Sequence, residues 1–123
     1  MVMSTARPVS AEELLLVNVH LGPGAGVARL EVSGDVDLCT TTTLEGALAD
    51  ALAGGTASIV VALDRCDFFA ACGYRALAEA ADVARARGGT LIVEGAPTSL
   101  RIIAGVVDEP GIVLQDRGGD QRS

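Results

Sequence analysis

The sequence contains no Lys and no Trp, and aromatic residues make up only 2% of its 123 positions. Without Lys, a phosphate-binding loop of the P-loop type cannot be built, and two Phe and one Tyr are too few for a platform on which bases stack. The net charge of −7 also repels a phosphate backbone. We therefore expect no nucleic-acid partner, and a partner protein with a basic surface instead.

Residues with side chains suited to metal binding or nucleophilic catalysis are scarce too. One His and three scattered Cys, without a CxxC pair, do not supply the four ligands of a zinc site, so we expect no metal and no cofactor. A cysteine phosphatase needs an Arg six positions after its thiol, where this chain has Glu45 and Ala78. His20, which would have to activate a nucleophilic cysteine, lies within a predicted strand. These residues do not indicate an enzyme.

Long apolar runs are absent as well. No stretch approaches the roughly 18 apolar residues of a membrane-spanning helix, and residues 1–10 lack the apolar region of a signal peptide. We expect a cytoplasmic protein, without a membrane partner, whose thiols (Cys39, Cys66 and Cys72) are reduced. The length suits one domain, which we place at 13–115 between flexible tails at 1–12 and 116–123.

What the chain does have is an alternation of strand and helix patterns. The predicted elements are strands at 14–21 and 27–34, a helix that starts at a capping box of Thr42 and Glu45, a strand at 58–63, a helix from Tyr74 to the glycines at 88–89, a strand at 90–95, a helix from Pro97, and a short additional strand at 111–114. The apolar runs at 58–63 and 90–95 favour strands buried on both faces. This order is typical of an α/β domain, a sheet with helices packed on it.

Three segments resemble the signature blocks of the STAS domain, and more narrowly those of bacterial anti-sigma factor antagonists. They read SGDVDLCTTTTLEGAL (33–48), IVVALDRCDFFAACGYRAL (59–77) and ARARGGTLIVEGAPTSLRII (84–103). The resemblance covers about residues 13–114. It implies a single STAS-like α/β domain with a mixed β-sheet of four to five strands and helices packed mainly on one face.

The second of these segments departs from the family at the position that carries regulation. In the family, a Ser beside a Gly at the start of a helix is phosphorylated by an anti-sigma factor that is also a kinase, and the added charge disrupts their contact. Here Cys72 occupies the acceptor position, and Ala70 and Ala71 stand where the family has Asp and Ser. The resemblance thus implies a regulator of transcription that binds a kinase-like anti-sigma factor and releases sigma factor. Because a thiol does not accept phosphate in this kinase chemistry, we expect no phosphorylation.

The resemblance also places two segments side by side as a partner-binding surface, the loop before the first helix and the start of the second helix. The candidate residues are Asp35, Asp37, Thr40, Thr41, Ala70, Ala71, Cys72, Gly73 and Tyr74. We expect Gly73→Trp to abolish binding while the protein still folds. We also expect one of the two Phe residues, Phe68 and Phe69, in the core and the other at the interface.

Several alternatives stay open at this point. Cys72 is either a neutral replacement of Ser or a redox-sensitive thiol, since the positive end of a helix dipole favours a thiolate. Asp35 and Asp37 either meet Arg residues of a partner or lie in a solvated loop. The alternative function is a STAS scaffold, or a sensor of a small ligand or of redox state, within a larger signalling assembly.

Overall fold

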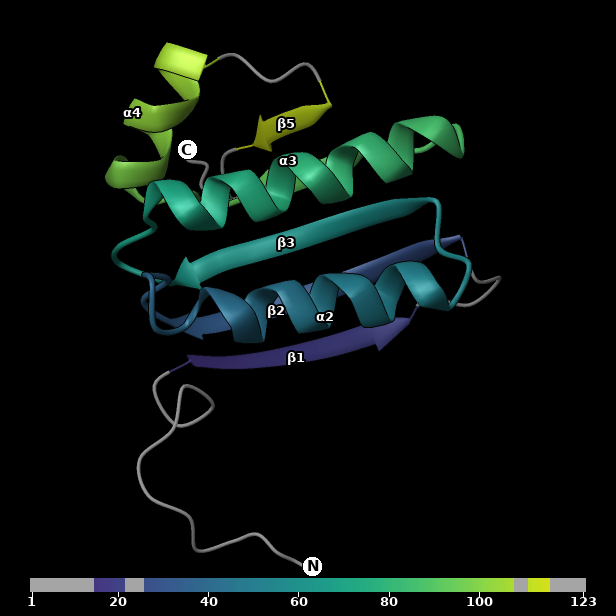
Figure 1. The fold of residues 1–123 in the computed structure, drawn as a ribbon, viewed down its shortest axis with the longest axis horizontal. Helices are drawn as coiled ribbons and strands as arrows, with labels where there is room; N and C mark the ends of the chain where they lie inside the picture. Colours follow the sequence, from purple (N-terminus) through teal and green to yellow (C-terminus); the bar gives the residue numbers. More distant parts are fainter. Residues whose placement is uncertain (1–14, 22–25, 108–110, 116–123) are drawn as a thin grey trace, which may run out of the picture.

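The computed structural model describes residues 15–21, 26–107 and 111–115, which form a five-stranded sheet and three helices (Figure 1). The elements in chain order are β1 (Leu15–Leu21), β2 (Val27–Gly34), α2 (Thr41–Ala53), β3 (Ser58–Arg65), α3 (Ala71–Ala86), β4 (Leu91–Glu94), α4 (Thr98–Val107) and β5 (Ile112–Gln115). The predicted order of elements is confirmed, including the short last strand. The predicted tails at 1–12 and 116–123 lie outside the described residues.

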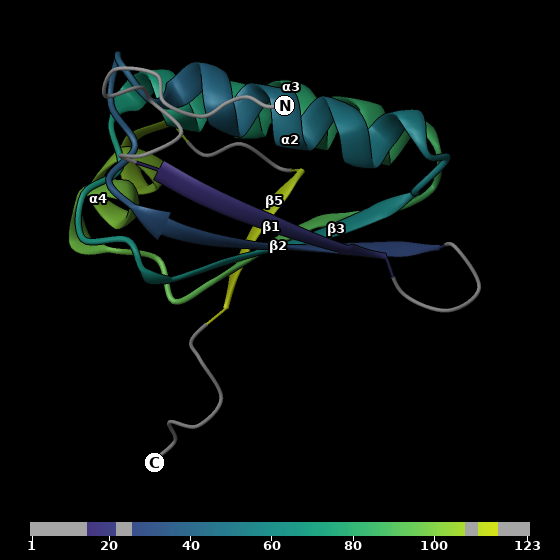
Figure 2. The same cartoon turned by 90° about the horizontal axis from the view of Figure 1, so that it is seen from below.

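The strands follow one another across the sheet in sequence order. β1 pairs with β2 in the antiparallel sense, and every later pair is parallel, as the predicted mixed sheet requires. Parallel neighbours need crossover connections, and α2 and α3 provide two of them. Both helices therefore run back along the same face of the sheet, and their N-termini lie at the same end of the molecule (Figures 1 and 2).

The core lies between the sheet and these two helices. On β2, Ala28, Leu30 and Val32 are buried, while the alternate residues Arg29 and Glu31 point to the opposite face, as the alternation in the sequence predicted. Figure 2 shows α2 and α3 on one face of the sheet and α4 near the end at which β2 and β3 finish. Among the described residues, the helices cover mainly one face, which confirms the predicted fold class.

The prediction that the strands at 58–63 and 90–95 are buried on both faces is confirmed only in part, since on the outward face Ala62 is buried but Val60 and Ile92 are only partly covered. On β3, Ile59 and Val61 are fully buried, whereas Val60, on the opposite face, is only partly covered. An ion pair crosses this open face, because Nη2 of Arg29 on β2 lies 3.1 Å from Oε1 of Glu94 on β4. β3 runs between these two strands, so charged side chains partly cover it where the apolar run suggested a second layer of helices.

Candidate functional site

The two segments of the predicted partner surface are joined directly. The loop after β2 and the loop before α3 form a parallel bridge between Val36 and Phe69. The Val36 amide donates to the carbonyl of Phe68 (2.9 Å), and the Ala70 amide donates to the carbonyl of Val36 (2.8 Å). The juxtaposition implied by the family resemblance is therefore present in this structure.

The loop before α2 is shaped by a compact turn around Asp37. Its Oδ1 accepts hydrogen bonds from the amides of Cys39 (2.9 Å) and Thr40 (3.1 Å). The Thr40 hydroxyl accepts from the Asp37 amide (2.9 Å) and donates to the carbonyl of Asp35 (2.8 Å). Thr40 is thus buried at 1% exposure and holds the loop, so its assignment to the partner surface is corrected.

This turn also explains why the predicted capping box is wrong. α2 begins at Thr41, one residue before Thr42, and its N-cap residue is Thr40, whose side chain makes no capping hydrogen bond. The Thr40 hydroxyl is already engaged by the loop that precedes the helix. Local side-chain bonds of this kind compete with capping, and here they decide where the helix starts.

The carboxylates of this loop have structural roles as well. Oδ1 of Asp35 accepts a hydrogen bond from the Phe68 amide (3.2 Å) and so ties the two loops together. Asp35 is exposed and Asp37 is half-buried. Each carboxylate therefore accepts hydrogen bonds from backbone amides through Oδ1. These bonds favour a structural role for Asp35 and Asp37 over a role in binding Arg residues of a partner.

At the start of α3, two candidate residues turn inward. Gly73 is buried, and a Cβ atom there would lie 2.6 Å from Cγ1 of Val36 and 2.8 Å from Cε1 of Phe69. Tyr74 is only 5% exposed and belongs to the hydrophobic core. The assignments of Gly73 and Tyr74 to the partner surface are therefore corrected. A Trp at Gly73 would meet the same two neighbours, so we now expect Gly73→Trp to disturb the core as well as any binding.

The surface at this end of the molecule carries apolar side chains. Leu38 is 82% exposed and Phe68 is 47% exposed, whereas Phe69 is fully buried, so the expectation of one Phe in the core is confirmed and an interface role for Phe68 stays a prediction. Ala71 is exposed, and Ala70 and Cys72 are half-buried. We call Leu38, Phe68, Ala71 and Cys72 the docking patch. The sequence analysis did not predict Leu38 as a residue of the partner surface. An apolar residue in a polar loop, here between Asp37 and Cys39, would have indicated it.

The three cysteines are unpaired and differ in environment. Cys39 is exposed and Cys72 half-buried, while Cys66 is buried and its Sγ donates to the carbonyl of Phe68 (3.2 Å). Burial raises the pKa of Cys66 to about 11, so this thiol stays protonated at neutral pH. Cys66 is thus a structural thiol within the loop that leads to α3.

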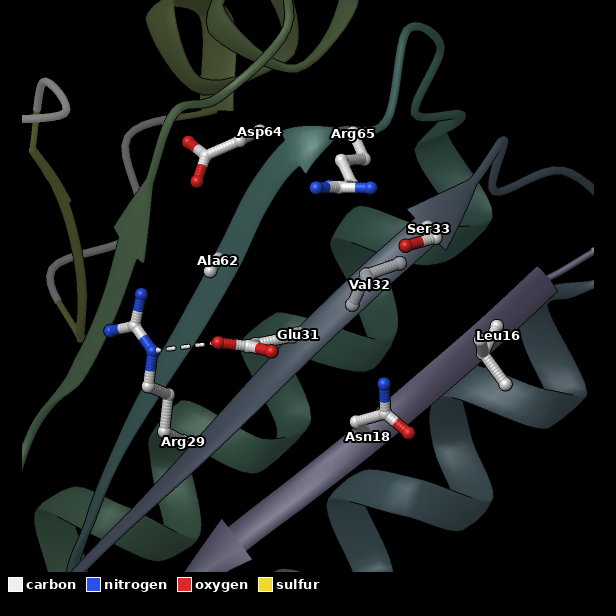
Figure 3. A pocket seen from close by; sticks show the side chains of 9 residues that line it. All are labelled: Leu16, Asn18, Arg29, Glu31, Val32, Ser33, Ala62, Asp64 and Arg65. Atoms are coloured by element: carbon white, nitrogen blue, oxygen red, sulfur yellow. Dashed lines mark hydrogen bonds and ion pairs between the residues drawn. The ribbon is translucent and has the colours of Figure 1, made fainter.

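Two of the hollows that the described residues line are mainly polar, and both lie outside the docking patch. One, of about 460 Å³, is on the open face of the sheet, where Figure 3 shows the ion pair between Arg29 and Glu31 (3.4 Å). The other, of about 370 Å³, is lined by Asp35, Asp37 and Asp67 together with Arg65. Within the described part of the chain, no group of three or more His, Cys, Asp or Glu residues could hold a metal ion. Nor is any described helix long and apolar enough to span a bilayer.

Comparison with known proteins identifies the family. The family model described as "Mlab, STAS domain" matches residues 23–109. A search of curated proteins gave no match. Similar solved structures include the anti-sigma factor antagonist SpoIIAA in its unphosphorylated form, at 13% identity and a TM-score of 0.67, covering 85% of this chain and 91% of that one. An anti-sigma factor antagonist from Mycobacterium paratuberculosis is 23% identical, with a TM-score of 0.65 and coverage of 85% of this chain and 90% of that one.

A third similar structure is the Bacillus cell fate determinant SpoIIAA in its phosphorylated form, at 13% identity and a TM-score of 0.64, covering 80% of this chain and 90% of that one. At such identities these likenesses concern the fold. The family model, in contrast, spans well over half of the sequence, including both loops of the docking patch. The chain therefore belongs to the STAS domain family.

Proposed function

We propose that this protein is an anti-sigma factor antagonist, which binds a kinase-like anti-sigma factor and thereby releases a sigma factor. Membership of the STAS family and the likeness to structures of such antagonists support this proposal. The observation that carries it is the docking patch. Two exposed apolar side chains, Leu38 and Phe68, lie in the two loops that the bridge of Val36 and Phe69 joins, and Cys72 follows in the first turn of α3.

The patch has the properties of a protein-binding surface. Leu38 and Phe68 both expose apolar area to water. Complete burial of a fully exposed side chain of this size contributes about 1.5–3 kcal/mol, which is an upper limit for each of them because both are partly buried already. The loops that present them are held by backbone hydrogen bonds between Val36, Phe68 and Ala70, so little conformational entropy is lost on binding. The net charge of −7 favours an encounter with a basic surface.

Cys72 determines how the proposed activity would be regulated. The family resemblance aligns it with the hydroxyl that a kinase phosphorylates, and a thiol is a poor acceptor for that transfer. Without an added phosphate, no charge of about −1.5 to −2 arises to break the contact. Release of sigma factor would then depend on the concentrations and relative affinities of antagonist and sigma factor for the same anti-sigma factor.

The experiment that tests the proposal measures binding to purified anti-sigma factors of the source bacterium by calorimetry. We expect Leu38→Asp to weaken binding at least about tenfold, because a carboxylate replaces the most exposed apolar side chain of the patch. Val106→Asp on α4 is the matched control, since Val106 is 81% exposed and Leu38 is 82% exposed. Equal affinity of the two variants, or no binding by the unmodified protein, would refute the proposal.

A further inference from the structure

A groove separates the two helices that cover the sheet. α2 and α3 lie side by side (Figure 1), and a hollow of about 170 Å³ lies between them. Its floor is apolar, with Leu48 and Leu52 from α2 and Ala76 and Ala80 from α3. Because the side chains of the two alanines are only methyl groups, they fill little of the groove on its α3 side. The side chains of an additional helix therefore have room to insert there.

The spacing of residues along the two helices shows where this groove leads. On α3, Cys72, Ala76, Glu79 and Val83 are four, three and four positions apart, so they share one face of the helix. Thr41, Glu45, Leu48 and Leu52 repeat this spacing on α2. Cys72 and Thr41 each stand in the first turn of their helix, and both helices start at the same end of the molecule. One residue of the docking patch, Cys72, therefore shares the helix face that lines the groove, and the groove runs along the helices from the end at which the docking patch lies.

Charge and exposure then restrict what fits into the groove. Each wall carries one exposed carboxylate, Glu45 on α2 and Glu79 on α3, and none of the described residues that line the hollow is basic. Val83, at its far end, is 39% exposed although apolar. A second copy of this chain would bring four carboxylates together, two from each groove, which is unfavourable. A helix with a row of apolar side chains between two rows of basic ones would instead fit the apolar floor and form ion pairs with the carboxylates of both walls.

We propose that the groove between α2 and α3 receives a basic amphipathic helix of the anti-sigma factor, in addition to the contact at the docking patch. This inference rests on the proposed function and names the segment of the partner that is bound. The apolar ridge of that helix would lie on Leu48, Leu52, Ala76 and Ala80. Its Arg or Lys residues would lie against Glu45 on one side and Glu79 on the other.

The first test uses a synthetic probe and does not require the anti-sigma factor. The probe is an amphipathic peptide of about 18 residues, built from Leu, Ala and Arg with Leu at helical spacing, and its binding is followed by fluorescence anisotropy. We expect saturable binding that Ala49→Trp weakens at least about tenfold, because the indole fills the groove from its α2 wall. Ala53→Trp is the matched control, since both alanines are exposed on α2 but only Ala49 lines the groove.

The charge requirement is tested with the same peptide. The double variant Glu45→Lys, Glu79→Lys should lose binding, whereas Asp50→Lys, an exposed position of α2 outside the groove, should retain it. Equal affinity for the unmodified protein and for Ala49→Trp would overturn the inference. So would self-association in sedimentation experiments that Ala49→Trp abolishes, because the groove would then hold a second copy of the chain.

Repeating the measurements with the anti-sigma factor separates this inference from the proposed function. If Leu38→Asp loses the anti-sigma factor and Ala49→Trp retains full affinity, the proposed function stands and the groove is not used. If both variants weaken binding and Ala53→Trp does not, both proposals are supported. If the peptide occupies the groove but no anti-sigma factor binds, the proposed function fails.

Discussion

Replacing Gly73 by Ala tests whether this residue serves packing or partner contact. A Cβ at Gly73 would lie 2.6 Å from Cγ1 of Val36 and 2.8 Å from Cε1 of Phe69. Ordinary contacts between carbon atoms are about 3.5–4.0 Å long, so one of these neighbours must move by about 1 Å. Both are fully buried, and the bridge between their backbones holds them in place.

Two effects of opposite sign decide the magnitude. Crowding of a packed core costs about 1–3 kcal/mol, whereas Gly→Ala within a helix gains at most about 1 kcal/mol. We therefore expect Gly73→Ala to lower the free energy of unfolding by about 1–2 kcal/mol, because crowding outweighs helix propensity. Gly46→Ala on α2 is the control. Gly46 is exposed and a Cβ there meets nothing within 4 Å, so this variant should be more stable than the unmodified protein.

The assay is urea denaturation followed by far-ultraviolet circular dichroism, with the same m-value for each variant. Val36→Ala should cost less stability in the Gly73→Ala background than in the unmodified protein, because it removes the methyl group nearest to the new Cβ. A coupling free energy above about 0.5 kcal/mol between the two substitutions would establish their contact. If Gly73→Ala is as stable as Gly46→Ala and yet loses the partner, Gly73 faces the partner and the packing explanation is refuted.

Two further predictions concern the thiols. Burial raises the pKa of Cys66 to about 11, so as the pH rises this thiol ionises in the unfolded chain before it ionises in the folded protein. The free energy of unfolding, measured by urea titration, should therefore fall between about pH 9 and pH 11, and Cys66→Ser should remove this part of the fall. If Cys66→Ser shows the same fall with pH, the raised pKa does not belong to Cys66. In the native protein, iodoacetamide should modify the exposed Cys39 and the half-buried Cys72 but not Cys66, and intact-mass spectrometry should find the third adduct only in urea; a third adduct under native conditions would show that Cys66 is accessible.

The sequence pattern predicted the elements well because their periodicity is strong. β2 alternates between buried Ala28 and Leu30 and outward Arg29, and the period of two is visible without coordinates. The run at 58–63 misled because β-branched residues favour a strand whether or not a second layer covers it. The ion pair of Arg29 with Glu94 depends on the order of strands across the sheet, which periodicity does not reveal.

At the candidate site, the sequence located the segments but not the direction of their side chains. The blocks at 33–48 and 59–77 do meet, through the bridge of Val36 and Phe69. Thr40 looked like a polar surface residue and is buried, because its hydroxyl bonds to the backbone of Asp35 and Asp37. Gly73 and Tyr74 turn inward because the phase of α3, which is set by its packing on the sheet, places both residues on the buried face of the helix.

The central claim is that the docking patch binds an anti-sigma factor without a kinase-operated release. The most direct measurement titrates the protein into a purified complex of sigma factor and anti-sigma factor, with ATP or with ADP, and records sigma release together with the intact mass of the antagonist. We predict equal release with both nucleotides and an unchanged mass, because Cys72 carries no acceptor hydroxyl. Loss of release with ATP, accompanied by a gain of one phosphate, would contradict the account.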